Sequence, residues 1–500
     1  MVDRGEETPD PGRGFDRSKL VKTKIAIPLI DDLNAKPRTR QPVIIDLSLI
    51  HPGGLQRARE LTHHAIEEVT GKELEEVVDV LKGEFTAQYV YARLTRREVV
   101  ELVRQDAQRE KETQQSAIYK VWPDFEVRPF LTESTATVKA DAARIAFSAM
   151  GEGITWAVAD TGIDATHAHF VKHSNLDIAL PVVHMDFTGE RAVDVKAPTD
   201  PNGHGTHVAG IIAGETGPDT NGSGKGSIII GTMERGEDGT ERCRTTPLLS
   251  SITGVAPKTK LVSLRVLDAD GNGRVSNLIA AAGYIQKVNE YGRWRRIDGV
   301  NMSVGYGFDP EWFACGQSPL CVEVDRLVRS GVSVVVAAGN TGYWKRGGKV
   351  DQLNSGLSLT INDPGNARLA ITVGATHRSE PHIFGVSYFS SKGPTGDGRL
   401  KPDLVAPGEQ VLSCAAGRMK DEFCAKAGGK EVHYGPYSGT SMAAPHVSGA
   451  IAAFLSIRKE FRGQPERVKE IFLTSATDLG REPYFQGRGL VDLMRAIQSV

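Results

Sequence analysis

The sequence predicts an α/β protein, in which a large, doubly wound and mostly parallel sheet is preceded by a small α+β domain. Strand-like and helix-like segments alternate through the last two thirds of the chain, a pattern typical of a parallel sheet with helices on both faces. The first third follows a different order, strand–helix–strand–strand–helix–strand. The chain has 500 residues, of which 40% are hydrophobic. It can therefore bury a large core, and it exceeds the usual size of one domain.

The first third divides into an extension and a candidate domain. Residues 1–40 are rich in proline and in charged residues, which predicts a flexible extension. Residues 41–124 supply the small domain, with strands expected at 43–47, 77–81, 88–92 and 118–121 and helices at 55–69 and after Thr95. Thr95 and Glu98 form a capping-box pattern at the start of the second helix. Residues 125–137 then form a linker with few structural signals.

Residues 138–500 supply the large domain. Strands are expected at 154–159, 261–267, 334–340 and 370–375, and helices at 275–288, 322–329 and from Ser441 onward. The last helix continues through an entirely apolar stretch at 451–455. We therefore expect this helix to lie in the middle of the domain.

One serine occupies a position suited to a nucleophile. The stretch 439–445 reads Gly-Thr-Ser-Met-Ala-Ala-Pro, so Ser441 lies in the first turn of a helix, after a tight glycine turn. Unpaired backbone N–H groups and the positive end of the helix dipole stabilise developing negative charge there. In isolation, the same serine fits a plain helix N-cap. A serine nucleophile also needs a base and an orienting acid.

Two further segments supply these groups. His204 lies between two glycines, ahead of a small-residue stretch that predicts a buried helix, and Asp160 directly follows the strand at 154–159. Asp160 shares its turn with Asp164, so an ordinary turn residue is the alternative. His204 and His207 could be read as a metal pair, although no third ligand follows in the manner of an HExxH motif. We interpret His207 as a hydrogen-bonded core histidine.

In the order Asp, His, Ser, these segments resemble the subtilisin-like serine peptidases. Further blocks carry the same resemblance: the strand at 334–340 ends in Gly-Asn, and residues 301–305 read Asn-Met-Ser-Val-Gly. The loops at 389–394 and 401–408 are also similar to family signatures. Together the blocks span residues 138–500, and their joint occurrence is far more specific than any one of them.

The resemblance implies a serine endopeptidase that forms an acyl-enzyme and is made as a self-processing zymogen. The implied catalytic residues are Asp160, His204 and Ser441, and the implied oxyanion donors are the Asn340 amide and the Ser441 backbone N–H. An asparagine after Ala-Ala-Gly is ordinarily a turn residue, and only the other blocks favour Asn340 as a donor. The implied substrate-binding residues are Ser303, Val304, Gly305, Ala337, Ala338 and Gly339.

Residues 41–124, placed before such a domain, resemble the inhibitory propeptide of the family, which assists folding and blocks the cleft. An unrelated ferredoxin-like module is the alternative. We expect self-cleavage between Asp124 and Val138, a segment that includes Phe130, Leu131, Thr132 and Glu133. The expected partners are therefore protein or peptide substrates and the chain's own N-terminal domain.

Composition argues against other partners. The net charge is −2 and both signs are dispersed, so neither a nucleic-acid nor a membrane partner is expected. No secretory signal or transmembrane segment is visible, because charged residues open the chain and the first apolar run, at 25–30, is short and broken by Pro28. The chain as written is expected in the cytoplasm. Secretion is the alternative if a leader was removed or export is non-standard.

The cysteines and metal ligands leave alternatives open. Cys315 with Cys321, and Cys414 with Cys424, could form disulfides that leave Cys243 unpaired, and an odd count of five is equally consistent with free thiols. The chemistry requires no cofactor. Structural calcium is common in the family, but no spacing in this chain defines or excludes a site.

Two departures from the family pattern concern the substrate. Residues 225–253 are interpreted as an insertion, in which the apolar run at 228–230 suggests a hairpin. A surface ornament is favoured over a part of the cleft rim. Asn362 lies near the expected pocket floor, where many relatives have a small residue. This favours apolar or neutral side chains before the cleaved bond.

A catalytically silent or permanently self-inhibited peptide-binding relative is the second candidate function. Silent relatives usually lose one triad residue or the oxyanion donor. All four of these residues are present here, namely Asp160, His204, Asn340 and Ser441. Their presence favours the active enzyme.

Overall fold

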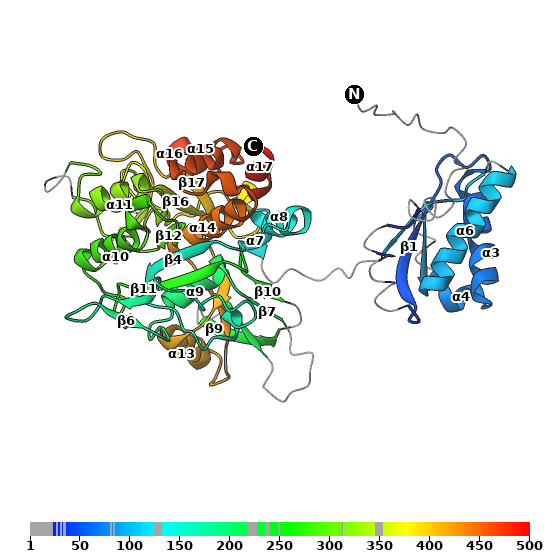
Figure 1. Ribbon diagram of the computed structural model, residues 1–500, viewed down its shortest axis with the longest axis horizontal. Helices are drawn as coiled ribbons and strands as arrows, with labels where there is room; N and C mark the ends of the chain where they lie inside the picture. Colours follow the sequence, from blue (N-terminus) through cyan, green and yellow to red (C-terminus); the bar gives the residue numbers. More distant parts are fainter. Residues whose placement is uncertain are drawn as a thin grey trace, which may run out of the picture. The chain divides into compact units, whose positions relative to one another are not determined.

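The computed structural model describes residues 24–500 apart from 27–28, 31–32, 34–36, 81–82, 84–85, 114, 124–132, 218–227, 236–240, 249–250, 310, 312–313 and 346–353. The chain divides into two compact units, Met1–Pro129 and Phe130–Val500. Each unit has a hydrophobic core of its own, and Figure 1 shows the helices and strands of both.

The N-terminal unit contains a three-stranded antiparallel sheet with β1 in its centre, paired with β2 and β3. The expected capping box is confirmed, because Thr95 N donates to Glu98 Oε2 at 2.7 Å and Glu98 N donates to Thr95 Oγ1 at 3.3 Å. The elements are β1 (Gln41–Leu47), α3 (Gly54–Thr70), α4 (Leu74–Val77), β2 (Tyr89–Leu94), α6 (Arg96–Thr113) and β3 (Ile118–Pro123).

The prediction of a strand at 77–81 is wrong. Val77 ends the short helix α4, and the next residue, Val78, forms a single antiparallel bridge with Ala92. Two glutamates in the first turn of α4, Glu75 and Glu76, complement the helix dipole and favour helix where the apolar run favours strand. Residues 81 and 82 lie outside the described residues, so the described part of the expected strand is reduced to one bridge.

The larger unit is built on an eight-stranded sheet with the order β17-β16-β13-β12-β4-β11-β5-β6. Every neighbouring pair is parallel except β5 with β6 at one edge. This is the mostly parallel sheet that the sequence predicts. Its strands are β4 (Thr155–Asp160), β5 (His184–Asp186), β6 (Val193–Val195), β11 (Lys260–Arg265), β12 (Gly299–Met302), β13 (Ser333–Ala337), β16 (Ile371–Thr376) and β17 (Leu404–Pro407).

Helices cover both faces of this sheet (Figure 1). Successive residues of one strand enter different cores, so Trp156 and Val158 of β4 face one core while Ala157 and Ala159 face the other. The first core contains α8 (Ala140–Phe147), α9 (His204–Ile212), α14 (Thr440–Ile457), α15 (Pro465–Ser475) and α17 (Leu493–Gln498), and the second contains α10 (Val275–Val288) and α11 (Pro319–Arg329).

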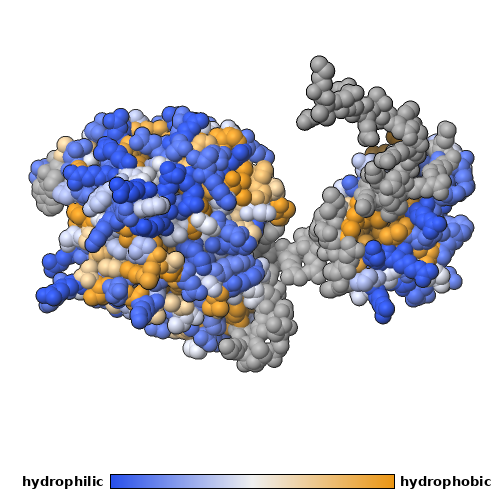
Figure 2. All heavy atoms as spheres, viewed as in Figure 1, coloured by the Kyte–Doolittle hydropathy of each residue, from blue (hydrophilic) through white to orange (hydrophobic). Residues whose placement is uncertain are grey.

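The central helix α14 is the one described helix that is long and apolar enough to cross a membrane, and 89% of it is buried inside the protein. It contacts β12, β13, β16 and β17 as well as α9 and α17. This confirms its expected place in the middle of the domain. The visible surface in Figure 2 mixes hydrophilic and hydrophobic residues, as the dispersed charges predict.

The hairpin expected in the insertion 225–253 is confirmed. β8 (Ile229–Arg235) and β9 (Glu241–Pro247) pair antiparallel. They extend a second sheet of order β18-β19-β8-β9, with β18 (Val411–Cys414) and β19 (Tyr434–Tyr437). The helix α13 (Gly417–Lys426) packs on this sheet through the small apolar cluster of Met419, Phe423, Cys243 and Val432.

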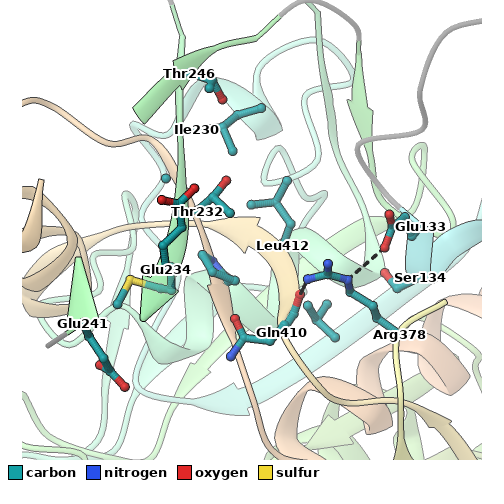
Figure 3. Close-up of a pocket in the computed structure, with 14 residues that line it drawn as sticks. Glu133, Ser134, Ile230, Thr232, Glu234, Glu241, Thr246, Arg378, Gln410 and Leu412 are labelled. Atoms are coloured by element: carbon teal, nitrogen blue, oxygen red, sulfur yellow. Dashed lines mark hydrogen bonds and ion pairs between the residues drawn. The ribbon is translucent and has the colours of Figure 1, made fainter. Parts of the chain in front are cut away.

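A cavity of about 470 Å³ opens beside this second sheet, and Figure 3 shows its lining. Glu133 and Ser134 lie on one side of it and residues 230–234 of β8 on the other. Arg378 crosses the rim, where its Nε donates to Glu133 Oε2 at 2.8 Å and its Nη1 donates to Gln410 O at 3.2 Å.

Glu133 begins a short helix within the expected linker. α7 (Glu133–Thr137) belongs to the larger unit, and Thr137 Oγ1 donates to Arg378 O at 2.6 Å. Together with the Arg378–Glu133 ion pair, this bond holds α7 in place. The end of the expected linker is therefore ordered, while its residues 125–132 lie outside the described residues.

All five cysteines are free thiols. Cys321 is buried in the core beside α11, while Cys315 is half-buried near Arg399. Cys414 is fully buried in the central core, and Cys424 packs in the separate cluster under α13. Of the two expected alternatives, the structure has free thiols.

The remaining elements are short: β7 (Glu215–Thr216), β10 (Ile252–Thr253), β14 (Tyr343–Lys345), β15 (Asn354–Gly356), α12 (Pro381–Phe384) and α16 (Pro483–Gln486).

Candidate active site

The carboxylate of Asp160 is positioned by the end of the central strand β4. Its side chain is fully buried. Oδ1 accepts hydrogen bonds from His204 Nδ1 at 2.7 Å and from Thr161 N at 2.8 Å. Because an ionised carboxylate only accepts, the imidazole proton lies on Nδ1 and Nε2 is left as a proton acceptor.

His204 is the first residue of α9, and Gly203 before it has φ +102°. A Cβ at Gly203 would lie 2.1 Å from Ala416 O, so only glycine fits this entry to the helix. Burial lowers the pKa of His204, but the negative charges of Asp160 and Asp200 outweigh burial and raise the pKa above its usual value. The base is thus held beside two carboxylates.

Ser441 is the second residue of α14, because the helix begins at Thr440, one residue earlier than the sequence analysis places its start. Its Oγ donates to Ser303 O at 3.0 Å, and Ser303 Oγ donates to Ser441 O at 2.9 Å. Two hydrogen bonds therefore fasten the start of α14 to the residue that follows β12. In this resting arrangement, the described hydrogen bond of the hydroxyl goes to Ser303 O and not to His204.

Asn340 follows β13, and hydrogen bonds from Thr440 orient its side-chain amide. Asn340 Oδ1 accepts from Thr440 N at 2.9 Å and from Thr440 Oγ1 at 3.1 Å. With its oxygen held in this way, the amide presents Nδ2 as a donor, and the Asn340 side chain lines the same cleft as Ser441. The sequence motif contains Thr440, but its orienting contact only becomes visible in three dimensions.

The cleft has a volume of about 620 Å³. Most of the expected binding residues line it, namely Ser303, Val304, Gly305, Ala337 and Gly339, together with His204, Asn340 and Ser441. Ala338 is the exception. It is fully buried, and its backbone pairs with Val373 and Asn362.

Asn362 also lines the cleft and is half-buried. Gly339 has φ +106°, and a Cβ there would lie 2.7 Å from the Asn362 amide, so the glycine admits this side chain. Asn362 Oδ1 accepts from Thr341 Oγ1 at 3.1 Å. The Asn362 Nδ2 group, by contrast, donates to no partner among the described residues.

Several residues near the base were missed at the sequence level. Asp200 accepts five hydrogen bonds and is 5% exposed. The Tyr437 ring stands edge-on to His204, with 6.4 Å between ring centroids. Met419, from α13, lines the cleft with Tyr437. The only signal for Asp200 was its place four residues before His204, where an acidic residue fits an ordinary turn equally well.

His207 contacts Gly435 O through Nε2 at 3.2 Å and is fully buried, in line with a hydrogen-bonded core histidine. Burial lowers its pKa to about 3. Among the described residues, no group of three or more His, Cys, Asp or Glu side chains is placed to hold a metal ion.

Comparison with known proteins gives consistent matches. The model of peptidase S8, described as the subtilase family, matches residues 151–489. Serine protease AprX of Bacillus subtilis (strain 168) is 29% identical over 391 residues, which cover 76% of this chain and 75% of that protein. Subtilisin E of the same strain is 30% identical over 290 residues, covering 58% of this chain and 60% of that protein.

Two further matches extend the comparison. Pyrolysin of Pyrococcus furiosus is 29% identical over 398 residues, which cover 69% of this chain and 25% of that protein. The crystal structure of a cold adapted subtilisin-like serine proteinase is 25% identical, with a TM-score of 0.43 and coverage of 69% of this chain and 88% of that one.

Proposed function

This chain belongs to the subtilase family of serine endopeptidases, and on that premise we propose that it cleaves proteins with Asp160, His204 and Ser441 as its catalytic triad. The observation that carries this proposal is the 2.7 Å bond from His204 Nδ1 to buried Asp160, in a cleft that also holds Ser441. This bond leaves Nε2 of His204 as the base.

The first step is attack on the scissile carbonyl. Ser441 Oγ turns from Ser303 O towards His204 Nε2, gives up its proton, and forms a bond to the carbonyl carbon. The carbonyl oxygen becomes an oxyanion, to which Asn340 Nδ2 and the Ser441 backbone N–H donate. Asp160 stabilises the imidazolium that forms on His204.

The second half returns the enzyme to its starting state. His204 gives its proton to the leaving nitrogen, the carbon–nitrogen bond breaks, and the new amine departs. Water then loses a proton to His204 and attacks the acyl-enzyme. Collapse of this second intermediate releases the acid product and restores the Ser441 hydroxyl.

The cleft also suggests how substrate is held. Residues 303–305, Ala337 and Gly339 line the cleft together with Ser441, and we assign them to the substrate backbone and to the side chain before the cleaved bond. Asn362 lies at that pocket, and its amide N–H group has no acceptor among the residues that the structure describes. This supports a preference for neutral side chains, including those that end in an oxygen acceptor.

We further propose that the chain is a zymogen. The N-terminal unit, with its own core, acts as an intramolecular inhibitor until the chain cleaves itself. Because α7 is fastened to Arg378, a cut upstream of Glu133 would separate the units and leave the larger one intact. We therefore propose that self-cleavage, expected between residues 124 and 138, falls within residues 124–132.

The test uses a serine-directed phosphonate. The processed wild type should take up one phosphonate, which peptide mapping should place on Ser441, and it should hydrolyse casein. Ser441→Ala is the matched control and should do neither. A folded wild type that neither reacts nor hydrolyses would instead favour the silent, peptide-binding alternative.

A further inference from the structure

We propose that Asp200 is a positioning residue of the catalytic base: it is a second buried carboxylate that fixes the first turn of α9 and stabilises His204 when it is protonated. This inference rests on the proposed function, because it gives Asp200 a role in the step at which His204 receives the serine proton.

The hydrogen bonds of Asp200 define its environment. Oδ1 accepts from Thr161 Oγ1 at 2.8 Å, from Gly203 N at 2.8 Å and from Asn202 N at 3.2 Å. Oδ2 accepts from Thr206 N at 2.8 Å and from Thr206 Oγ1 at 2.7 Å. All five contacts are donated to the carboxylate, so the site is built for the ionised form.

These partners lie on both sides of the Asp160–His204 bond. Thr161 directly follows Asp160, while Gly203 and Thr206 flank His204. Thr161 Oγ1 also accepts from Gly205 N at 2.9 Å. One carboxylate therefore ties the end of β4 to the start of α9, and it satisfies helix N–H groups that Gly203, as N-cap, cannot satisfy with a side chain.

The charge of Asp200 acts on the same imidazole. It raises the pKa of His204, in the same direction as Asp160. Burial raises the pKa of Asp200 itself, and its hydrogen bonds oppose that shift. Because the carboxylate is 5% exposed, solvent and salt screen its interaction with the imidazolium only weakly.

Within the described part of the chain, few other charged or titratable groups face His204. Asp160 packs against it from β4, and the Tyr437 ring stands edge-on to it. His207, on the same helix, is held neutral by burial. Arg418, whose main-chain N donates to Pro201 O at 3.0 Å, pairs its side chain with Asp270 at 2.8 Å. Asp200 is thus the second fixed negative charge beside the base.

The test is the pH profile of kcat/KM for Asp200→Asn, measured with a peptide substrate. Activity requires neutral His204, so activity is lost as pH falls through the pKa of His204. Removing one negative charge should move this acid limb to lower pH by roughly one unit. The plateau kcat/KM should also fall about tenfold or more, because α9 loses its tie to β4.

Thr206→Val is the matched control. It removes the hydroxyl bond to Asp200 but keeps the charge, so it should reduce stability and leave the acid limb in place. A purely structural Asp200 would instead give two variants that lose activity with the same acid limb as the wild type, and that result would overturn the inference.

A wild-type readout covers the case in which Asp200→Asn does not fold. The acid limb of the wild type should give a pKa for His204 above 6.5, the value of an unperturbed histidine, despite burial. A His204 pKa below 6.5 would contradict the proposal that the charge of Asp200 stabilises the protonated imidazole. An inactive wild type would refute the proposed function, whereas an active enzyme with an unmoved acid limb would refute this inference alone.

Discussion

The Ser441 hydroxyl donates to the main-chain oxygen of Ser303 at 3.0 Å, and the Ser303 hydroxyl donates back to Ser441 O at 2.9 Å. The nucleophile is therefore hydrogen-bonded to Ser303, the first residue of the segment that we assign to substrate binding. Ser303 Oγ also accepts from Asn301 Nδ2 at 2.8 Å, within the core. The helix that carries the nucleophile is thus fixed by a buried polar network.

Ser303→Ala should show how much this network contributes to the stability of the fold. The change removes the donor to residue 441 and leaves Asn301 Nδ2 without its acceptor, so the free energy of unfolding should fall by about 1–3 kcal/mol. Denaturant unfolding in a Ser441→Ala background, which keeps the carbonyl acceptor and prevents autolysis, measures this. The change Ser358→Ala, at an exposed serine, is the control, and equal effects of the two changes would argue against a fixed network.

Asn340→Ala should lower kcat by about 10²- to 10³-fold while changing KM much less, because the lost donor acts on the oxyanion and not on bound substrate. Steady-state kinetics on a peptide substrate separate the two parameters. Thr440→Val keeps the amide but removes one of its two orienting bonds, so its effect should be smaller. A change in KM alone for Asn340→Ala would place this amide in substrate binding.

Asn362→Asp should change which peptides are cut. A negative charge in the pocket beside Gly339 should raise kcat/KM for Lys or Arg before the cleaved bond by about tenfold relative to Leu, at low salt. A mixed peptide library read by mass spectrometry measures the shift. Asn362→Ala controls for the lost amide, and an unchanged profile in both variants would remove Asn362 from the pocket floor.

Acid should destabilise the fold through its buried histidines. Burial lowers the pKa of His169 and His207 to about 3 and that of His167 and His446 to about 4. The unfolded chain binds these protons near pH 6.5 and the folded chain does not. Stability is therefore fully present above pH 6.5 and is lost as pH falls towards 4, by about 1.4 kcal/mol per pH unit for each histidine.

His446→Gln isolates one of these contributions. His446 accepts no hydrogen bond at Nε2 from the described residues and contacts Met442 O through Nδ1 at 2.8 Å. Denaturant unfolding between pH 7 and pH 5, again in the Ser441→Ala background, should show a shallower loss of stability for the variant. Parallel curves for variant and parent would mean that His446 titrates normally in the folded state.

The sheet and the central helix could be predicted because local patterns mark them, whereas the pairing of Asp160 with His204 was implied by the family resemblance of the two segments. Asp160 ends an apolar strand, and glycines that permit close packing flank His204. Asp200 was missed because its role depends on Thr161, 39 positions earlier, and on main-chain donors that exist only once α9 forms. No local residue pattern predicts a carboxylate that accepts hydrogen bonds from segments so far apart in the sequence.

Two further outcomes also have physical reasons. Spacing alone left a Cys414–Cys424 disulfide and free thiols both open. The thiols are free, because α13 begins between the two cysteines and carries Cys424 into a different cluster. The apolar residues after Val77 read as strand, while the acidic residues before them started a helix. In both cases a neighbouring helix decided the outcome.

The most direct test of the account is the intact mass of purified wild type beside Ser441→Ala, each incubated alone and then assayed on casein. The account predicts that the wild type shortens within residues 124–132 and hydrolyses casein, while Ser441→Ala stays full length and inactive. If Ser441→Ala were shortened at the same position and hydrolysed casein equally well, Ser441 would not be the nucleophile and the proposed mechanism would be wrong.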